Sequence, residues 1–500
     1  MKREYLPLET LPSWARLNGI TTNGVAFRKL APTGDDDGAD KGTAIVATEE
    51  RVNASEEGGG DAGDVLLSVS SDMVLSLQMV ETHAKTDRYL KEVLDAVGEF
   101  DRTARGAILI FLIMQITHSS PDFTTEPHKI GVSNPWSEYV KYMPPSITLP
   151  TFYTEEELEL LQGTSLRLAV DAKVISLEKE FEHLRKSTES ISWCEKLWWD
   201  EETGRFTFDD WRYVDAVYRS RMVDLPSSGH AMVPCVDMAN HASGDAVKAL
   251  YDEDIEGNAV LRLRWGKKLN AGDEVTISYG NEKPASEMVF SYGFLNPERT
   301  AANQVFVDLD IPDDDPLKMA KMAFYKGAPG VRILSPPASS ETQSTGWDSP
   351  FVWWACVNEE DGLDFNVLQT NDGGRELRAS WKGEEVDLSG DLRNCLATDP
   401  LWDVFQLRAV VTILDRLETQ FFTLQQTQGM IAEISQDERM REIFRPDVFD
   451  TVMRLRGLEA KMLEKAIGDL AKQRDDLMTT ETVSAYLNSQ QSGDVEEDFS

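Results

Sequence analysis

Three short stretches near the middle of the chain decide the fold: VPCVDMANH (residues 233–241), GDEVTISYG (residues 272–280) and YGF (residues 292–294). The first leads from an apolar run to an Asn-His pair. The second alternates apolar and polar residues, as strands do, and ends in Tyr-Gly. The third repeats Tyr-Gly and adds an aromatic residue. A hydrophobic core alone does not need this ordered series, so we interpret it as part of a functional site.

Short strands are expected on both sides of this series, because several segments are rich in β-branched residues or alternate between apolar and polar ones. The predicted strands are residues 25–29, 43–48, 65–69, 259–265 and 274–279. The last of them places Tyr279 at the end of a strand. The polar stretches 33–42 and 53–63 read as loops at hairpin tips, where extra length costs little stability.

The segment between the N-terminal strands and the central series reads as mostly helical. Residues 105–117 form a strongly apolar helix. Thr154 and Glu157 have the spacing of a capping box, which opens a helix. Gly163 ends that helix, and a longer one runs to about residue 183. Residues 208–222 form another helix.

The composition changes after residue 297. Residues 303–310 read as a strand. Residues 401–434 and 439–473 read as two long amphipathic helices that could pair as an antiparallel hairpin. Residues 335–349 look like a loop, and residues 351–394 favour no single element. The final residues, 488–500, are expected to be disordered.

Length, charge and cysteine usage limit the possible classes of protein. Five hundred residues predict two or three domains. No run approaches eighteen apolar residues, so no membrane span is expected. The N-terminus lacks an apolar signal region, and the four cysteines have no C-x-x-C spacing, which favours the cytoplasm, with the nucleus as the alternative. A net charge of −37 should repel nucleic acids and anionic membranes and attract basic partners, although solubility alone also explains it.

The ordered Asn-His, Tyr-Gly and Tyr-Gly-Phe motifs resemble those of the SET-domain methyltransferases. The segment PWSEYVKYMPPSITLPTFYTEEELELLQGTSL (residues 135–166) narrows the resemblance to one class. That class includes the Rubisco large-subunit lysine methyltransferase, fungal ribosomal-protein lysine methyltransferases and the actin histidine methyltransferase. The zinc-binding cysteine clusters that flank many histone-directed SET domains are absent from this sequence, which favours the same class.

The resemblance implies an α+β fold in which short β-sheets surround a knot-like crossing. It implies a SET domain over residues 14–296, interrupted by a helical insertion at about residues 87–212. A mainly α-helical domain over residues 297–487 would bind the substrate, and residues 488–500 would form the disordered tail. The family likeness is strong for the first part and weaker for the second.

The resemblance also implies site residues. Tyr279 would be the catalytic tyrosine. The residues that would contact the cofactor S-adenosylmethionine are Gly42, Thr43, Ala44, Arg221, Asn240, His241, Tyr279 and Tyr292. The residues that would bind the substrate are Asp237, Tyr251 and Phe294. Ala44 departs from the family pattern, which has a second glycine there. No metal site is expected, because His241 has no partner at ligand spacing.

The chemistry of such a site is simple, because the cofactor carries an activated methyl group. The protein must hold a neutral amine in line with that group, and an aromatic, apolar channel helps by lowering the pKa of a lysine. We therefore expect a protein-lysine N-methyltransferase acting on a non-histone protein, such as a ribosomal protein or a translation factor, and working as a monomer. A protein-histidine N-methyltransferase and a non-catalytic SET-like binding protein are the alternatives. Taken alone, each tyrosine could equally be a core residue with a hydrogen-bonded hydroxyl.

Overall fold

We describe a computed structural model of the chain. The residues described are 1–30, 42–53, 65–123, 130–280, 282–336, 344–369, 374–386, 392–434 and 442–497. The predicted hairpin loops therefore lie outside the described residues, except for residues 42 and 53. None of the described helices is long and apolar enough to cross a membrane.

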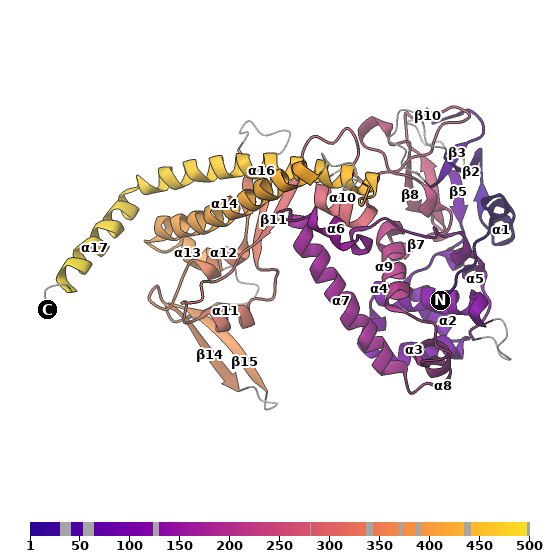
Figure 1. Cartoon of the computed structure of the whole chain (residues 1–500), viewed down its shortest axis with the longest axis horizontal. Helices are drawn as coiled ribbons and strands as arrows, with labels where there is room; N and C mark the ends of the chain where they lie inside the picture. The colour runs from indigo at the N-terminus through magenta and orange to yellow at the C-terminus, as the bar shows by residue number, and fades with distance from the viewer. Residues whose placement is uncertain are drawn as a thin grey trace. The chain divides into compact units, whose positions relative to one another are not determined.

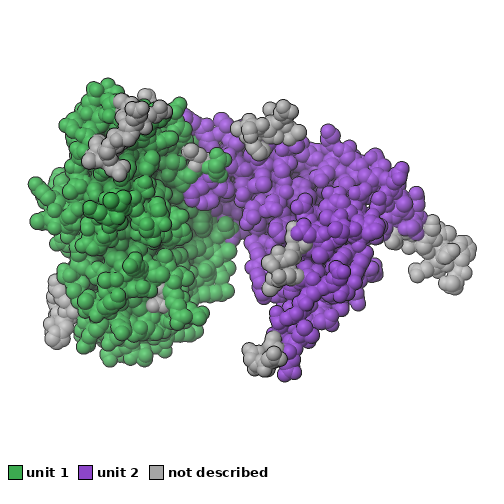
Figure 2. Space-filling model, turned by 180° about the vertical axis from the view of Figure 1, so that it is seen from behind, with its two compact units in different colours: residues 1–153, 169–282, 289–296 green, residues 154–168, 283–288, 297–500 purple. Residues whose placement is uncertain are grey.

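The chain divides into two compact units (Figure 2). Unit 1 comprises residues 1–153, 169–282 and 289–296. Unit 2 comprises residues 154–168, 283–288 and 297–500. The short segment 154–168, which lies within the helical part of the sequence, therefore belongs to the same unit as the C-terminal helices.

Unit 1 contains short antiparallel strands arranged in small sheets (Figure 1). The four-stranded sheet has the order β1 (Thr21–Thr22), β5 (Val65–Val69), β9 (Ala259–Leu263) and β8 (Ala249–Glu253). The two-stranded pairs are β2 (Val25–Lys29) with β3 (Thr43–Ala47), β4 (Arg51–Val52) with β10 (Lys268–Leu269), and β6 (Met222–Leu225) with β7 (Gly229–Met232). Four of the strands predicted from the sequence, at residues 25–29, 43–48, 65–69 and 259–265, are confirmed as β2, β3, β5 and β9.

The helices of this part of the chain are α1 (Leu11–Leu17), α2 (Leu77–Ala84), α3 (Arg88–Val97), α4 (Ala104–Ser119), α5 (Pro135–Tyr139), α7 (Ser165–Thr188), α8 (Ser192–Cys194), α9 (Phe208–Arg221) and α10 (Ala285–Tyr292). The apolar helix predicted at residues 105–117 is confirmed as α4, which is buried on all sides over residues 106–117. Thr103 caps α4 by accepting a hydrogen bond from the backbone N–H of Gly106. The first turn of the helix passes the backbone of Phe100 so closely that an added Cβ at Gly106 would lie 1.9 Å from its carbonyl oxygen.

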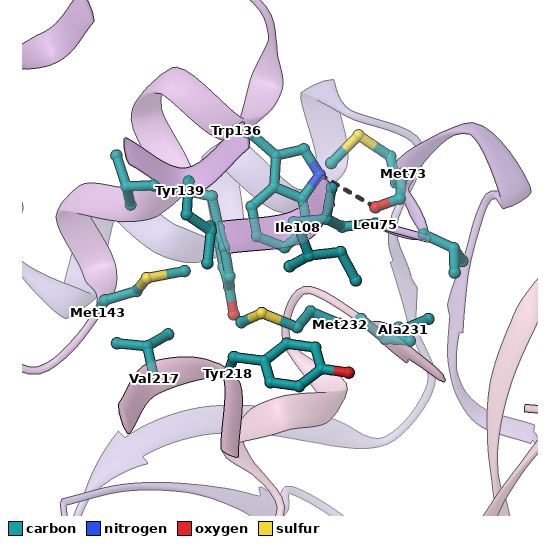
Figure 3. Packing of buried hydrophobic residues seen from close by; sticks show 14 of the residues in the cluster. Met73, Leu75, Ile108, Trp136, Tyr139, Met143, Val217, Tyr218, Ala231 and Met232 are labelled. Atoms are coloured by element: carbon teal, nitrogen blue, oxygen red, sulfur yellow. Dashed lines mark hydrogen bonds between the residues drawn. The ribbon is translucent and has the colours of Figure 1, made fainter. Parts of the chain in front are cut away.

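The core of unit 1 joins α4 and α5 to the strand β7 and the helix α9. In Figure 3, Trp136 and Tyr139 of α5 point into this core, and the indole N–H of Trp136 donates to the carbonyl oxygen of Met73 at 3.2 Å. Tyr139 is buried in the same core cluster as Met232 of β7 and Val217 of α9 (Figure 3). The phenol of Tyr139 therefore links the helical insertion to the central series of the sequence.

The strand predicted at residues 274–279 is wrong. This segment makes only two isolated bridges, an antiparallel one from Glu274 to Val46 and a parallel one from Ile277 to His241. The N–H of Val275 donates to Ile45, whereas the N–H of Ile277 donates to Asn240. Because the segment exchanges its partner within two residues, no continuous ladder forms. We call the contact between residues 240–242 and 275–279 the crossing.

Unit 2 contains strands as well as helices. One three-stranded sheet has the order β11 (Gln304–Asp308), β12 (Gly330–Leu334) and β13 (Gly346–Asp348). A second has the order β14 (Leu363–Gln369), β15 (Arg375–Trp381) and β16 (Glu384–Val386). Its helices are α6 (Glu155–Glu159), α11 (Lys318–Phe324), α12 (Pro350–Ala355), α13 (Leu392–Ala397), α14 (Trp402–Ile434), α16 (Pro446–Met478) and α17 (Glu481–Glu497). The sequence predicted β11 but not the other strands. α17 also continues into the range 488–500 for which disorder was expected, and residues 498–500 lie outside the described residues.

The helices α14 and α16 lie side by side (Figure 1). Arg456, early in α16, donates to the carbonyl oxygen of Leu424, late in α14, and Arg408, early in α14, donates to Tyr486 beyond the end of α16. The predicted antiparallel pairing is therefore confirmed. The second helix, predicted from residue 439, begins among the described residues at Pro446, which occupies its first turn, and Arg445 before it is extended. Residues 439–441 lie outside the described residues.

Segment 154–168 is bound to these two helices by buried polar contacts within unit 2. The predicted capping box is present, and Glu157 also accepts hydrogen bonds from the backbone N–H and guanidinium of Arg445. Ser165 donates its backbone N–H and hydroxyl to Glu459 at 2.8 and 2.6 Å. Gly163 has a φ of +80°, and a Cβ there would lie 2.6 Å from the Cα of Leu424. Only glycine fits so close to α14 with that backbone conformation.

Candidate functional site

Tyr279 stands at the end of the crossing and is fixed at two points. Its hydroxyl donates to the backbone carbonyl oxygen of Ala239 at 2.9 Å. Its backbone N–H donates to Nδ1 of His241 at 3.1 Å. Its ring lies 4.5 Å from the ring of Tyr292, with an angle of 32° between the planes. The crossing therefore sets both the position and the orientation of the phenol.

His241 has a structural task in this arrangement. Because its Nδ1 accepts the N–H of Tyr279, the proton of the neutral ring belongs on Nε2, which lies 3.1 Å from Oγ of Ser243. The ring also lies 6.0 Å from that of Phe294. The side chain of Asn240, one residue earlier, donates to Oε1 of Glu274 at 2.7 Å. The Asn-His pair thus joins the two strands of the crossing through side chains as well as backbone.

Asp237 is held between a cation and a phenol. Nη1 of Arg221 donates to its carboxylate at 3.1 Å and to its backbone carbonyl at 3.0 Å. The hydroxyl of Tyr139 donates to the other carboxylate oxygen at 2.5 Å and accepts the N–H of Cys235 at 2.8 Å. The side chain of Asp237 is only 2% exposed. Its carboxylate thereby anchors the turn of residues 235–239, in which Cys235 has a φ of +71°.

A small cavity of about 40 Å³, open to solvent, lies beside these residues. Its lining combines the end of α9, the start of β6, the turn before the crossing, the strand β8, the crossing and the end of α10. The lining residues are Ser220, Arg221, Met222, Val223, Val236, Asp237, Ala239, Tyr251, Ile277, Ser278, Tyr279 and Tyr292. Five of the residues predicted for the site, namely Arg221, Asp237, Tyr251, Tyr279 and Tyr292, are therefore brought together.

The other predicted site residues do not line this cavity. Asn240, His241 and Phe294 lie directly behind it, in contact with Tyr279 or Glu274. Gly42, Thr43 and Ala44 form the entry to β3, which reaches the crossing only through its later residues. Gly42 has a φ of +70°, and Ala44 is completely buried. The methyl group that replaces the family's second glycine is thus packed into the core.

Burial controls the charge state of the phenols. Burial raises the pKa of Tyr279 well above its usual range, although the cation of Arg221 opposes this shift. Tyr279 is therefore neutral at physiological pH, so it can give and accept hydrogen bonds but cannot act as a base. Burial alone would lower the pKa of Arg221, yet the carboxylate of Asp237 raises it, so the guanidinium stays charged. An aromatic cavity lined by a guanidinium and a carboxylate suits a ligand that carries a carboxylate and an amine.

Sequence reasoning missed Ser220 and Tyr139. Ser220 directly precedes Arg221 in the sequence, but its small side chain gave no separate signal. Tyr139 lies in the helical segment, 98 residues before Asp237, and nothing local to either residue links them. The pairing of a buried carboxylate with a distant phenol depends on the packing of α5 against the core. Only the structure reveals it.

The sequence of the chain is similar to those of several known proteins. No family model matches the chain. SET domain-containing protein 8 of Schizosaccharomyces pombe is 27% identical over 69% of this chain and 74% of its own length. The actin-histidine N-methyltransferase of Xenopus tropicalis is 23% identical over 95% of this chain and 71% of its own. The tobacco Rubisco large-subunit N-methyltransferase is 27% identical over 36% of this chain and 37% of its own.

A solved structure described as Rubisco LSMT bound to AdoMet superposes with a TM-score of 0.57, covering 99% of this chain and 100% of that one, at 16% identity. The α+β SET fold expected from the sequence is therefore confirmed. The chain is therefore similar to SET-domain methyltransferases, the Rubisco large-subunit methyltransferases among them.

Proposed function

We propose that the chain is an S-adenosylmethionine-dependent protein-lysine N-methyltransferase that acts on a non-histone protein. The observation that carries this proposal is the cavity walled by Tyr251, Tyr279 and Tyr292, with the hydroxyl of Tyr279 fixed on Ala239. Aromatic faces accommodate an amine both before and after it gains a methyl group and a positive charge. A buried tyrosine in a plain core needs no such opening to solvent.

The donor set fits the proposed cofactor. Arg221 uses one guanidinium nitrogen on Asp237, and a guanidinium has further N–H groups in its planar fork that suit a carboxylate. Asn240 carries an amide, which both donates and accepts hydrogen bonds and so suits an amino-acid end. We assign to cofactor binding the residues Gly42, Thr43, Ala44, Arg221, Asn240, His241, Tyr279 and Tyr292. When bound, S-adenosylmethionine supplies a methyl group that its sulfonium centre has already activated.

The chain's own residues then select and orient the acceptor. A lysine side chain that enters the cavity loses water, which lowers its pKa and favours the neutral, nucleophilic amine. The hydroxyl of Tyr279 donates its hydrogen to Ala239, so its oxygen remains available to accept a hydrogen bond from an amine N–H. Tyr279 orients the amine in this way and takes no proton from it. Asp237, Tyr251 and Phe294 complete the proposed substrate site.

We extend the proposal to the organisation and partners of the chain. Residues 14–296 form the SET domain with its insertion at 87–212, and residues 297–487 bind the protein substrate. A net charge of −37 favours a basic protein, such as a ribosomal protein or a translation factor, as the partner. The chain acts as a monomer in the cytoplasm, with the nucleus as the alternative location. This reading excludes nucleic acid and membranes as direct partners.

Histidine is the second candidate acceptor. It is favoured by the relative that matches 95% of this chain, which is an actin-histidine N-methyltransferase. An imidazole is neutral near pH 7 without any help from desolvation, so the same cavity could orient it.

The test is methylation of basic cytosolic proteins with cofactor labelled at its methyl group. The labelled proteins are hydrolysed, and their amino acids are separated. Labelled methyllysine that depends on the chain supports the proposal, and labelled methylhistidine supports the second candidate. The absence of both, with a folded chain that binds the cofactor, would contradict the enzymatic reading and favour a binding protein.

A further inference from the structure

Arg219 lies on α9 directly before Ser220 and Arg221, which line the cavity, but its own contacts lead elsewhere. Its Nε donates to the carboxylate of Asp215 at 2.8 Å. Its Nη1 donates to the backbone carbonyl oxygen of Phe290 at 2.6 Å, and its Nη2 to the hydroxyl of Thr151 at 3.0 Å. The side chain is 10% exposed. One planar fork thus connects three segments of unit 1.

The bond to Phe290 closes the end of a helix. α10 ends at Tyr292, so the carbonyl of Phe290 belongs to the last turn, whose carbonyls have no partner within the helix. A cation is favourable at this end of a helix, because the helix dipole is negative there. The guanidinium also lies 4.5 Å from the centre of the Phe290 ring. Arg219 therefore acts as a side-chain cap for α10.

This cap is two residues from the aromatic wall of the cavity. Tyr292 follows Phe290 and places its ring 4.5 Å from that of Tyr279. Gly293 then turns the chain with a φ of +81°, and a Cβ there would lie 2.3 Å from the carbonyl oxygen of Thr148. The end of α10 is thus pressed against the segment of Thr148 and Thr151, which Arg219 also binds. These contacts together leave Tyr292 little freedom.

The guanidinium itself is fixed from behind. Asp215 has a completely buried side chain, and it also binds Arg105 at 2.6 Å and Lys173 at 2.9 Å. Arg105 in turn pairs with Glu180 of α7 at 2.9 Å. A buried carboxylate surrounded by three cations has a single favourable arrangement of its partners. The helices α4, α7 and α9 therefore fix the direction in which Arg219 points.

We propose that Arg219 is a positioning residue for methyl transfer. It bonds the end of α10, which carries Tyr292, to α9, which carries Arg221. It touches neither the proposed cofactor site nor the cavity itself. The inference rests on the proposed function for its effect on catalysis, whereas its effect on the end of α10 can be measured without any substrate.

The first test is hydrogen exchange of residues 289–296 in the full chain without ligand. Arg219→Gln should increase the exchange rate there by about tenfold or more, because a hydrogen bond to a charged donor is lost. Arg219→Lys keeps a charge beside Asp215 but cannot bind three partners at once, so it should show a smaller increase in the same place. If Arg219→Gln fails to fold, the exchange of Arg219→Lys provides the test instead. Unchanged exchange in folded variants would overturn the inference.

Arg212→Gln is the matched control. Arg212 lies on the same helix and also binds Thr151, through its carbonyl oxygen at 3.0 Å, but it makes no described hydrogen bond to α10. It should leave the exchange of residues 289–296 unchanged. An equal increase in this control would show general loosening of α9 and would contradict a specific role for Arg219.

The second test asks whether Arg219 acts through Tyr292. Arg219→Gln should lower kcat more than it changes KM, by about tenfold, because a misplaced orienting group acts mainly on the transfer step. In a Tyr292→Ala background the same substitution should have little further effect. Additive losses would contradict action through Tyr292. If the unaltered chain transfers no methyl group while the exchange result holds, the proposed function fails and the positioning role stands.

Discussion

At the scale of single residues, Tyr279 is held at both its hydroxyl and its backbone. Ala239 accepts a hydrogen bond from the hydroxyl, and His241 accepts one from the backbone N–H. The two residues that flank Asn240 therefore fix the phenol of Tyr279. The segment Ala239-Asn240-His241 therefore positions the ring of Tyr279. Because burial keeps the phenol neutral, its task in the proposed reaction is orientation.

Replacement of Tyr279 by phenylalanine keeps the ring and removes the hydroxyl. We expect methyl transfer to fall by about a hundredfold, the usual effect of removing one oriented polar group from a catalytic site. The affinity for the cofactor should stay nearly the same, because the ring still packs on Tyr292. Turnover and cofactor titration of the purified variant measure the two effects. Unchanged turnover would rule out the role assigned to Tyr279.

Asp237→Asn tests the anchor beneath the cavity. Removing one partner of a buried ion pair leaves the other unpaired, so we expect the free energy of unfolding to fall by about 3 kcal/mol. Asp224→Asn, an exposed position on β6, is the control and should change stability little. Denaturant titration of both variants measures the difference. Equal stability of the two variants would contradict a structural role for Asp237.

The sequence motifs could predict most of the residues near the cavity. They could not predict which residues line the cavity and which support its lining. The cavity is lined by four residues that the family resemblance implied: Arg221, Tyr251, Tyr279 and Tyr292. The side chains of Asn240 and His241 instead contact Glu274 and Tyr279, which their sequence alone does not reveal. The contact of Tyr139 with Asp237 could not be predicted, since it depends on tertiary packing rather than on local pattern.

At the scale of elements, strong periodic patterns predicted structure well. α4 is apolar on all sides, and a cap at Thr103 marks its start, so its position could be read directly. The segment 274–279 failed because alternation predicts an extended chain but does not say which neighbours it pairs with. The strands of unit 2 between residues 363 and 386 were missed because they are rich in polar and exposed residues.

The contacts of segment 154–168 with α16 predict a dependence of stability on pH. Burial raises the pKa of Glu459 from 4.5 to about 7, although the hydroxyl and N–H of Ser165 and the cation of Arg456 oppose the shift. The folded pKa is above the unfolded one, so the folded state is favoured most below about pH 4.5 and loses stability as the pH rises to 7. The loss amounts to about 3 kcal/mol.

Glu459→Gln should remove this dependence. Relative to the variant, the unaltered chain should lose melting temperature between about pH 4.5 and pH 7, the interval between the unfolded and folded pKa values of Glu459. Glu464→Gln, an exposed position on the same helix, should show no such trend. Thermal melting of the three proteins at both pH values provides the comparison. A constant difference between the unaltered chain and Glu459→Gln would contradict a raised pKa.

At the scale of the whole molecule, the charge of −37 is the dominant property. If the substrate is a basic protein, long-range attraction should bring it to the chain, and salt should screen that attraction. We expect KM for the protein substrate to rise several-fold between about 50 and 300 mM salt, while kcat changes little. Steady-state kinetics at the two salt concentrations, with cofactor affinity as the control, measure this. A KM that does not respond to salt would contradict a basic substrate.

The most direct test of the central claim is calorimetric titration of the purified chain with S-adenosylmethionine, with Asn240→Ala measured in parallel. We predict a dissociation constant in the range of about 1 μM to 100 μM for the unaltered chain and much weaker binding for the folded variant. Such a result would establish a working cofactor site at the crossing. A folded, unaltered chain that does not bind the cofactor would contradict its assignment as a methyltransferase.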